Sequence, residues 1–220
     1  MIEAVIFDMD GVLIDSENHW QRTERNIFAK LGIELTDELL YQTRGLRTEE
    51  MVEHWSNRFD LKAVDSEELM NRYDAVMVET MKNDVSMMDG ALEAIQFFKE
   101  KNLPIALASC STQDHIDATM ERHGLWKYFD LLVSAAENMP GKPHPEVYLK
   151  TAEMLSTVPT KCLAIEDSFY GLISAISARM KVVVMPDPVE YDQPRYGAAD
   201  LKIRSLREIN EETFDQLQKI

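Results

Sequence analysis

The sequence predicts an α/β protein: a doubly wound parallel sheet with a Rossmann-like core, and a second, smaller helical cap domain inserted after the first strand. Three observations favour this fold. The chain opens on an apolar strand, strands alternate with amphipathic helices towards its end, and the stretch between is helical throughout. We therefore expect a core of residues 1–15 and 84–220 and a cap of residues 16–83, for which 220 residues are enough.

The first strand is followed at once by two carboxylates. Residues 4–7 form an uninterrupted apolar run, typical of a strand buried on both faces, and Asp8, Asp10 and Gly11 come next. Side chains at i and i+2 of a strand point the same way, so the two carboxylates should repel each other unless a divalent cation lies between them. One could then act as nucleophile and the other as acid or base. A plain turn is the alternative, since Asp and Gly both favour turns.

The segment after the first strand contains helical patterns and no convincing strand. Ser16 or Asp15 is a candidate cap for the first helix and Thr36 for the second, and Ser66 heads the last. We expect this block to cover the carboxyl ends of the strands, where it would exclude water and select substrates. A helical extension of the core is the alternative. The expected helices span 16–31, 36–43, 48–59 and 65–82.

The remainder of the chain alternates between strand-like and helix-like patterns. Ligands of such parallel sheets bind at the carboxyl ends of the strands, and Asp8, Ser109, Glu166 and Asp167 all fall at that edge. The expected strands are 104–108, 130–133, 162–165 and 182–185, and the expected helices are 90–101, 112–123, 145–156 and 168–180.

The composition of the chain limits the classes of molecule that it could bind. The formal charge of −16, from 39 acidic and 23 basic residues, disfavours nucleic acid and anionic membrane surfaces. A phosphate site would therefore need its own cation and nearby Lys or Arg. No apolar stretch approaches the roughly 18 residues of a membrane span, and acidic residues interrupt any signal peptide. Cys110 and Cys162 are expected to be reduced thiols, which favours a cytoplasmic protein, and we expect a monomer.

Four motifs, in this order along the chain, resemble those of haloacid dehalogenase-like hydrolases: Asp8-Met9-Asp10-Gly11, Ser109 after an apolar strand, Gly141-Lys142-Pro143-His144-Pro145, and Ile165-Glu166-Asp167-Ser168 followed by Gly171. The helical insert is similar to the family's C1-type cap. Three further segments resemble bacterial sugar-phosphatases that act on hexose 6-phosphates, including 2-deoxyglucose 6-phosphate: Asp15-Ser16-Glu17, Gly45-Leu46-Arg47 and Ala178-Arg179-Met180.

The resemblance and the chemistry of the residues imply the same roles. Asp8 would attack phosphorus in line and form an aspartyl-phosphate. Asp10 would protonate the leaving sugar oxygen and then deprotonate the hydrolytic water. Mg²⁺, a hard ion that prefers oxygen ligands, would bind Asp8, the backbone carbonyl of Asp10, and Asp167.

Other residues are expected to hold the phosphate. The Ser109 hydroxyl and the Cys110 amide offer donors, although Ser109 is also a candidate helix cap. Lys142 would neutralise the phosphate and the nucleophile, the alternative being a solvated surface lysine. Glu166 would orient metal-bound water or support Lys142, with direct ligation left open.

Substrate selection is expected to depend on the cap. Glu17 and Arg47 are candidates to contact sugar hydroxyls or phosphate, although Arg47 could equally pair with Glu50 on a helix face. Trp20 and Trp55 are expected to pack within the cap. The prediction is a Mg²⁺-dependent phosphatase acting on small phosphorylated sugars, with hexose 6-phosphates as the expected substrates.

A beta-phosphoglucomutase-like isomerase is the alternative function. The resemblance implies that such mutases carry a His a few residues after Ser16 and an Arg three residues beyond the cap glycine. Here Trp20 stands at the first position and Arg47 lies two residues past Gly45, but the adjacent His19 keeps the mutase open. A dehalogenase is disfavoured because its chemistry needs neither a metal nor a general acid, whereas Asp10 and the Glu166-Asp167 pair are both present. A catalytically silent binding module is disfavoured because every residue that the chemistry requires is present.

Overall fold

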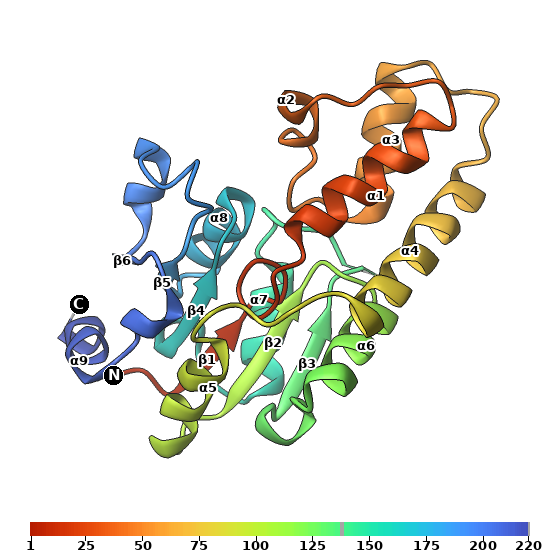
Figure 1. The fold of residues 1–220 in the computed structure, drawn as a ribbon. Helices are drawn as coiled ribbons and strands as arrows, with labels where there is room; N and C mark the ends of the chain where they lie inside the picture. Colours follow the sequence, from red (N-terminus) through yellow and green to blue (C-terminus); the bar gives the residue numbers. More distant parts are fainter. Residues whose placement is uncertain (137–138, 220) are drawn as a thin grey trace.

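The computed structural model describes residues 1–136 and 139–219 of the chain. Within these ranges the centre is a parallel sheet of six strands in the order β3-β2-β1-β4-β5-β6 (Figure 1). The predicted doubly wound sheet is confirmed. The strands are β1 (Ala4–Phe7), β2 (Ile105–Ser109), β3 (Leu131–Ser134), β4 (Cys162–Glu166), β5 (Lys181–Val184) and β6 (Leu201–Lys202).

The two faces of the sheet carry different side chains because successive residues of a strand point to opposite sides. Val5 and Phe7 of β1 belong to one hydrophobic cluster and Ala4 and Ile6 to the other. The first cluster includes residues of α5 (Ala91–Glu100), α6 (Gln113–His123) and α9 (Glu211–Lys219), and the second includes residues of α7 (Glu146–Met154) and α8 (Phe169–Ser177). Covering both faces explains why the strands are continuously apolar.

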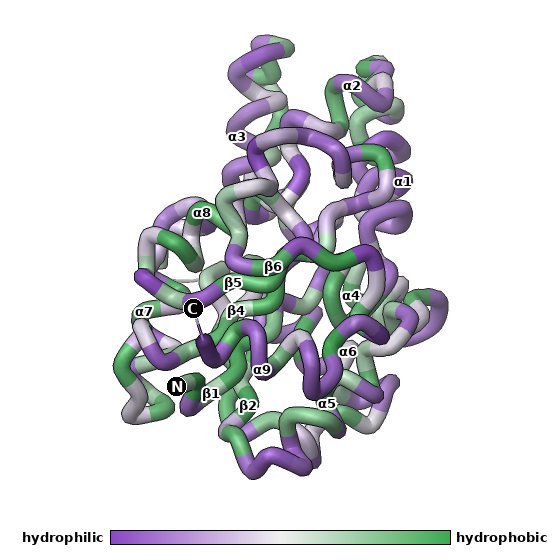
Figure 2. The backbone as a smooth tube through the Cα atoms, turned by 90° about the vertical axis from the view of Figure 1, so that its left-hand side faces the viewer, coloured by the Kyte–Doolittle hydropathy of each residue, from purple (hydrophilic) through white to green (hydrophobic). Residues whose placement is uncertain are grey.

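The helical segment after β1 lies beyond the carboxyl ends of the strands (Figure 1). Between residues 16 and 83, all of which the structure describes, it contains no strand. Figure 2 shows mainly hydrophobic residues along β4 and β5. It shows a mixture of hydrophobic and hydrophilic residues along α1 (Glu17–Ala29) and α3 (Thr48–Arg58), as expected of helices with one buried face. The helices are α1 (Glu17–Ala29), α2 (Asp37–Leu40), α3 (Thr48–Arg58) and α4 (Ser66–Asn83).

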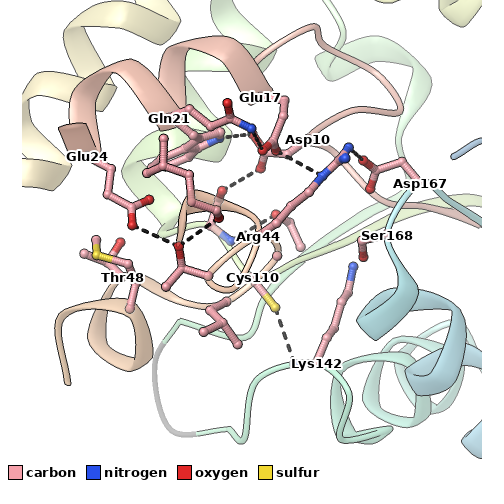
Figure 3. Close-up of a pocket in the computed structure, with 18 of the residues that line it drawn as sticks. Asp10, Glu17, Gln21, Glu24, Arg44, Thr48, Cys110, Lys142, Asp167 and Ser168 are labelled. Atoms are coloured by element: carbon pink, nitrogen blue, oxygen red, sulfur yellow. Dashed lines mark hydrogen bonds and ion pairs between the residues drawn. The ribbon is translucent and has the colours of Figure 1, made fainter. Parts of the chain in front are cut away.

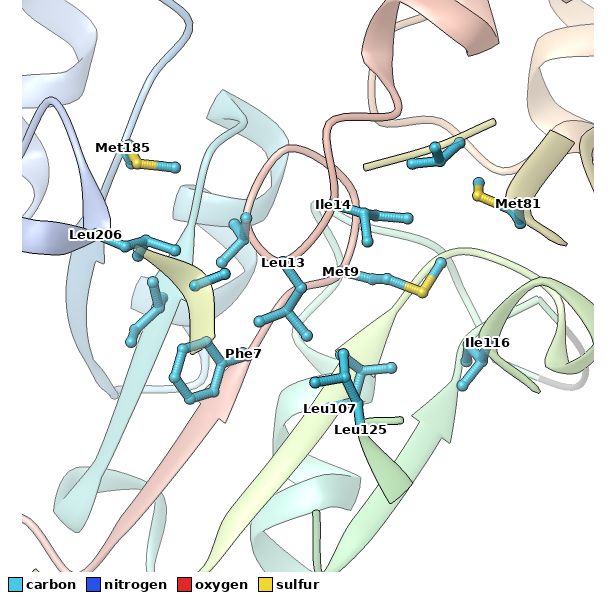
Figure 4. Packing of buried hydrophobic residues seen from close by; sticks show 14 of the residues in the cluster. Phe7, Met9, Leu13, Ile14, Met81, Leu107, Ile116, Leu125, Met185 and Leu206 are labelled. Atoms are coloured by element: carbon cyan, nitrogen blue, oxygen red, sulfur yellow. The ribbon is translucent and has the colours of Figure 1, made fainter. Parts of the chain in front are cut away.

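The core and this helical segment share one hydrophobic cluster. Met9 and Ile14, from the loop after β1, are fully buried in the same cluster as Met81 of α4 (Figure 4). The loop is also held to the returning chain, because the Asp15 amide donates to the Ser86 carbonyl at 2.9 Å. That residues 16–83 form a cap with its own boundaries stays a prediction.

Several local expectations need correction. Ser16 precedes α1 but makes no capping bond with its side chain, and neither does Thr36 before α2. Helix α4 is capped instead by Asp65, which accepts from the backbone amides of the first turn. Helix α2 is a single turn, shorter than predicted, and the two-residue strand β6 and four 3₁₀ turns of the described chain were not predicted.

Both cysteines are free, as predicted, with Cys162 buried and Cys110 partly buried. The two described ends of the chain meet beside α9, where the Ile2 amide donates to the Gln218 side chain at 2.7 Å (Figure 1). Within the described ranges we find no helix with the length and hydrophobicity that a membrane span requires.

Candidate active site

The loop after β1 places two carboxylates beside the neighbouring strand β4. The amide of Asp8 donates to the Ile165 carbonyl at 2.9 Å, which continues the ladder between the two strands. The carbonyl of Met9 then accepts from the Leu13 amide at 2.8 Å, which closes a tight turn. Gly11 in this turn has φ +72°, and a Cβ there would lie 2.3 Å from Asp167 Oδ2. Only glycine therefore lets the turn approach Asp167 this closely.

Asp10 is held by three donors, two from the start of α1 and one from the loop after β2. Its Oδ1 accepts from Ser16 Oγ at 2.5 Å and Trp20 Nε1 at 2.6 Å, and its Oδ2 accepts from Ser111 Oγ at 2.7 Å. Trp20 packs against Tyr73 as expected, with ring centroids 5.6 Å apart, but its hydrogen bond to Asp10 was not predicted. Spacing alone could not reveal this contact, since an indole on a helix face is usually there for packing. Together the donors fix the orientation of the Asp10 carboxyl group.

Lys142 is a buried cation and not a surface residue. Its Nζ donates to Asp8 Oδ1 at 2.7 Å, to Glu166 Oε1 at 2.7 Å and to the Ala108 carbonyl at 3.0 Å. Burial disfavours the charged ammonium, but Asp8 and Glu166 outweigh it and raise the pKa of Lys142 well above its usual value. The lysine therefore stays charged and fixes one oxygen of each carboxylate.

Glu166 is fully buried and engaged through both oxygens. Besides Lys142, Oε1 accepts from the Tyr148 hydroxyl at 2.6 Å, and Oε2 accepts from the Asp167 amide at 3.2 Å. A Cβ at Gly171 would lie 2.0 Å from the Glu166 carboxyl carbon, so the helix backbone of α8 confines this side chain. The role of Tyr148 was not predicted, because in the sequence it looks like any aromatic residue on the apolar face of a helix.

Three buried carboxylates form a cluster that suits a divalent cation. Asp8, Glu166 and Asp167 each offer an oxygen, and these oxygens all lie within 4.8 Å of one another. Burial, only partly offset by Lys142, raises the pKa of Asp8 to about 7. Burial likewise raises the pKa of Asp167 well above its usual value. A hard cation with oxygen ligands would offset this charge, so the donor set fits Mg²⁺ or a similar ion.

A pocket of about 90 Å³ lies between this cluster and the helical segment (Figure 3). Ser109 lies in its wall, where its Oγ accepts from the Ser111 amide at 3.0 Å, while Thr112 caps α6 in its place. Burial raises the pKa of the Cys110 thiol to about 11, which makes a thiolate nucleophile unfavourable. The predicted site residues that line the pocket are Asp8, Asp10, Glu17, Ser109, Cys110, Lys142 and Asp167.

The arginine in the pocket is Arg44 and not the predicted Arg47. Arg47 is not among the described residues that line the pocket, and its Nη2 pairs with Glu50 Oε1 at 3.0 Å. Its Nη1 donates to the Met139 carbonyl at 2.9 Å. Arg44 instead reaches Asp167 Oδ2 at 2.9 Å and Glu17 Oε2 at 3.5 Å. The helix-face alternative for Arg47 is thus the observed one.

This arrangement defines the class of the protein. A model of the haloacid dehalogenase-like hydrolase family matches residues 5–185, so the chain belongs to that family, as its motifs indicate.

Particular relatives share most of the chain. It is 37% identical over 209 residues to hexitol phosphatase B of Escherichia coli K12, covering 94% of each protein. It is 34% identical over 178 residues to a phosphorylated carbohydrates phosphatase of Thermotoga maritima, covering 80% of this chain and 82% of that one. Among solved structures it is similar to a beta-phosphoglucomutase from Clostridium difficile, with a TM-score of 0.84, 25% identity, and coverage of 100% and 98%.

Proposed function

We propose that this hydrolase is a Mg²⁺-dependent phosphatase of small phosphorylated sugars, with hexose 6-phosphates as substrates, acting through an aspartyl-phosphate on Asp8. The observation that carries the proposal is the contrast between two adjacent carboxylates. Asp8 is bound on one oxygen by a buried lysine, whereas Asp10 is held by side chains from the helical segment and the core. The two relatives named as phosphatases of hexitols and of phosphorylated carbohydrates support the substrate class.

Asp8 is suited to act as the nucleophile. Lys142 holds Oδ1, and none of the described residues donates a hydrogen bond to Oδ2, which is left to attack phosphorus. As the new bond between Oδ2 and phosphorus forms, the bond between phosphorus and the sugar oxygen breaks. Water then attacks the aspartyl-phosphate and releases inorganic phosphate, which divides one difficult displacement into two easier ones.

Asp10 is suited to move the proton. In its protonated form it donates to the departing sugar oxygen, and in its ionised form it takes a proton from the hydrolytic water. Ser16 and Ser111 can serve both forms, since a hydroxyl group donates to a carboxylate and also accepts from a carboxylic acid. Trp20 keeps Oδ1 aimed in one direction throughout.

The remaining residues bind and neutralise the phosphate. The Ser109 hydroxyl, the Cys110 amide and Lys142 would hold its oxygens, since all three residues line the pocket. Asp8, Asp167 and the backbone carbonyl of Asp10 would hold Mg²⁺, which when bound supplies positive charge to the phosphoryl oxygens. Because both oxygens of Glu166 are engaged within the protein, we assign it to positioning Lys142 and not to metal ligation.

The helical segment 16–83 would act as the cap. It contributes one wall of the pocket through α1 and the loop that follows α2. Closed over the carboxyl ends of the strands, it would keep bulk water from the reacting phosphate and contact the sugar.

Isomerisation is the competing reaction, since the similar solved structure is that of a beta-phosphoglucomutase. At the position where the resemblance implies a histidine in mutases, Trp20 donates to Asp10. The adjacent His19 is not among the described residues that line the pocket. This geometry favours hydrolysis.

The test is release of inorganic phosphate from a panel of hexose 6-phosphates, hexose 1-phosphates, pyrophosphate and nucleotides, with β-glucose 1-phosphate followed for isomerisation. We expect release from the 6-phosphates that stops with EDTA and in Asp8→Asn. Isomerisation without phosphate release would overturn the proposal in favour of a mutase. Activity that survives EDTA would remove the metal from it.

A further inference from the structure

One wall of the pocket is a polar face of helix α1. Glu17, Gln21 and Glu24 lie four and then three residues apart, so they share one side of the helix, and all three line the pocket. Figure 3 shows their side chains extending from α1 over the pocket. From Glu17 to Glu24 this face extends about 10 Å along the helix axis. The face is therefore long enough to follow a substrate chain of several carbon atoms.

Glu24 is buried and rigidly held, yet only one of its oxygens is used. Glu24 is only 6% exposed to solvent. Its Oε1 accepts from Trp55 Nε1 at 2.5 Å and from Thr43 Oγ1 at 2.9 Å, and the Trp55 ring is itself fully buried. Among the described residues, none donates to Oε2. Because Glu24 lines the pocket, this second oxygen is free to accept a hydrogen bond from a ligand.

The rest of the wall also offers acceptors. Gln21 donates through Nε2 to Glu17 Oε1 at 2.8 Å, and none of the described residues donates to its amide oxygen. Arg44, the cation nearest to this wall, lies 2.9 to 3.6 Å from four carboxylates, so its charge is already more than balanced. These four belong to Glu17, Asp167, Asp187 and Glu190. When its carboxyl groups are ionised, the wall is therefore negatively charged and offers hydrogen-bond acceptors, beside the Nε and Nη1 donors of Arg44, which have no hydrogen-bond partner among the described residues.

We propose that Glu24 is a specificity-determining residue that accepts a hydroxyl group of an uncharged polyhydroxy tail and excludes tails carrying a carboxylate or a second phosphate. The inference rests on the proposed phosphatase function, because it states which phosphate esters the same pocket takes. Burial raises the pKa of Glu24 to about 7, so the carboxylate is ionised above that pH and a hydroxyl donor then satisfies Oε2 with a charge-assisted hydrogen bond. An anionic group at the same place meets a like charge in a site with little water, which is strongly unfavourable.

The wild-type protein provides the first test through matched substrates. Glucitol 6-phosphate and gluconate 6-phosphate have the same carbon chain but end in a hydroxymethyl group and a carboxylate, respectively. At about pH 8, where Glu24 is ionised, we expect kcat/KM to favour the neutral compound by at least about tenfold. Fructose 6-phosphate and fructose 1,6-bisphosphate form the second pair, and we expect kcat/KM to favour the compound without the second phosphate. Equal values, or a preference for the anionic member, would overturn the inference.

Glu24→Gln tests the residue itself. The amide keeps an oxygen for Trp55 and Thr43 and replaces Oε2 with an uncharged NH₂ group, so the shape of the site is retained. We expect the neutral-to-anionic ratio of kcat/KM to fall by about tenfold or more. Glu53→Gln, at an exposed glutamate of α3, is the matched control and should leave the ratio unchanged. An unchanged ratio in folded Glu24→Gln would contradict the assignment.

Two further measurements separate the possible failures. Acetyl phosphate has no polyol tail, so its hydrolysis by the wild type, and the loss of that hydrolysis in Asp8→Asn, test the phosphatase proposal alone. If acetyl phosphate is hydrolysed but the wild type does not prefer neutral tails, the specificity inference fails and the phosphatase proposal stands. If no phosphate ester is hydrolysed, both fail. If Glu24→Gln does not fold, the wild-type substrate pairs decide.

Discussion

Glu24 should make the stability of this protein depend on pH. Burial raises its pKa from the ordinary 4.5 to about 7, although the hydrogen bonds from Trp55 and Thr43 act in the opposite direction. The folded state therefore holds this proton more tightly than the unfolded chain does. The contribution of Glu24 is most favourable below about pH 4.5 and is progressively lost as the pH rises towards 7. At 1.36 kcal/mol per pKa unit, the loss amounts to about 3 kcal/mol.

Glu24→Gln removes this ionisation while keeping the size and one acceptor of the side chain. Relative to wild type, the variant should gain about 2 to 3 kcal/mol of unfolding free energy between about pH 5 and about pH 8. Urea unfolding of both metal-free proteins at the two pH values measures this difference. Other carboxylates titrate in both proteins and cancel in the comparison.

The same unfolding experiment on Glu53→Gln provides the control, since an exposed glutamate should show little change with pH. If the difference in unfolding free energy between Glu24→Gln and wild type is the same at both pH values, Glu24 does not hold its proton as the structure indicates. The burial argument for its role in the pocket would then be refuted.

Three other substitutions test the site. Asp10→Asn should lower kcat for phosphate release by about 10²- to 10⁴-fold without shifting the urea midpoint, and a full rate would exclude proton transfer by Asp10. Lys142→Met leaves the buried carboxylates of Asp8 and Glu166 without their cation. It should lower the unfolding free energy of the metal-free protein in urea by about 3 to 5 kcal/mol. An unchanged urea midpoint would argue against buried ion pairs at Lys142. Gly171→Ala places a Cβ 2.0 Å from the Glu166 carboxyl carbon. Displacement of Glu166 should lower kcat/KM by about 100-fold with the fold retained in a thermal melt, whereas wild-type kinetics would show that the position of Glu166 is unimportant.

The residues at the carboxyl edge of the sheet could be predicted because the sequence patterns that mark the ends of the strands are local. An apolar run followed by Asp8 marks the end of β1, and similar runs before Ser109 and Glu166 mark β2 and β4. Parallel pairing then brings these ends together without further information, as the register of Phe7 with Leu107 and Ile165 shows. Strand β6 was not foreseen, because two residues beside β5 contain too short a pattern to recognise.

The side of the pocket formed by residues 16–83 could not be predicted in the same way. Arg44 and Arg47 flank Gly45, and nothing in their spacing says which one enters the pocket. Gly45 has φ +78°, so the chain turns sharply there, and Glu50 then captures Arg47 at the start of α3. Trp20 is a similar case, since its contact with Asp10 depends on how the loop after β1 enters α1. These outcomes depend on tertiary contacts and not on local patterns.

The proposed function depends on transfer of the phosphoryl group to Asp8. The most direct test is to mix the protein with Mg²⁺ and a hexose 6-phosphate, quench the reaction rapidly in acid, and locate the added phosphoryl group by mass spectrometry of peptides. We predict a phosphoryl group on Asp8 that decays as inorganic phosphate appears, and none in Asp8→Asn. Phosphate release that proceeds at the same rate in Asp8→Asn, or a phosphoryl group trapped on another residue, would contradict the account.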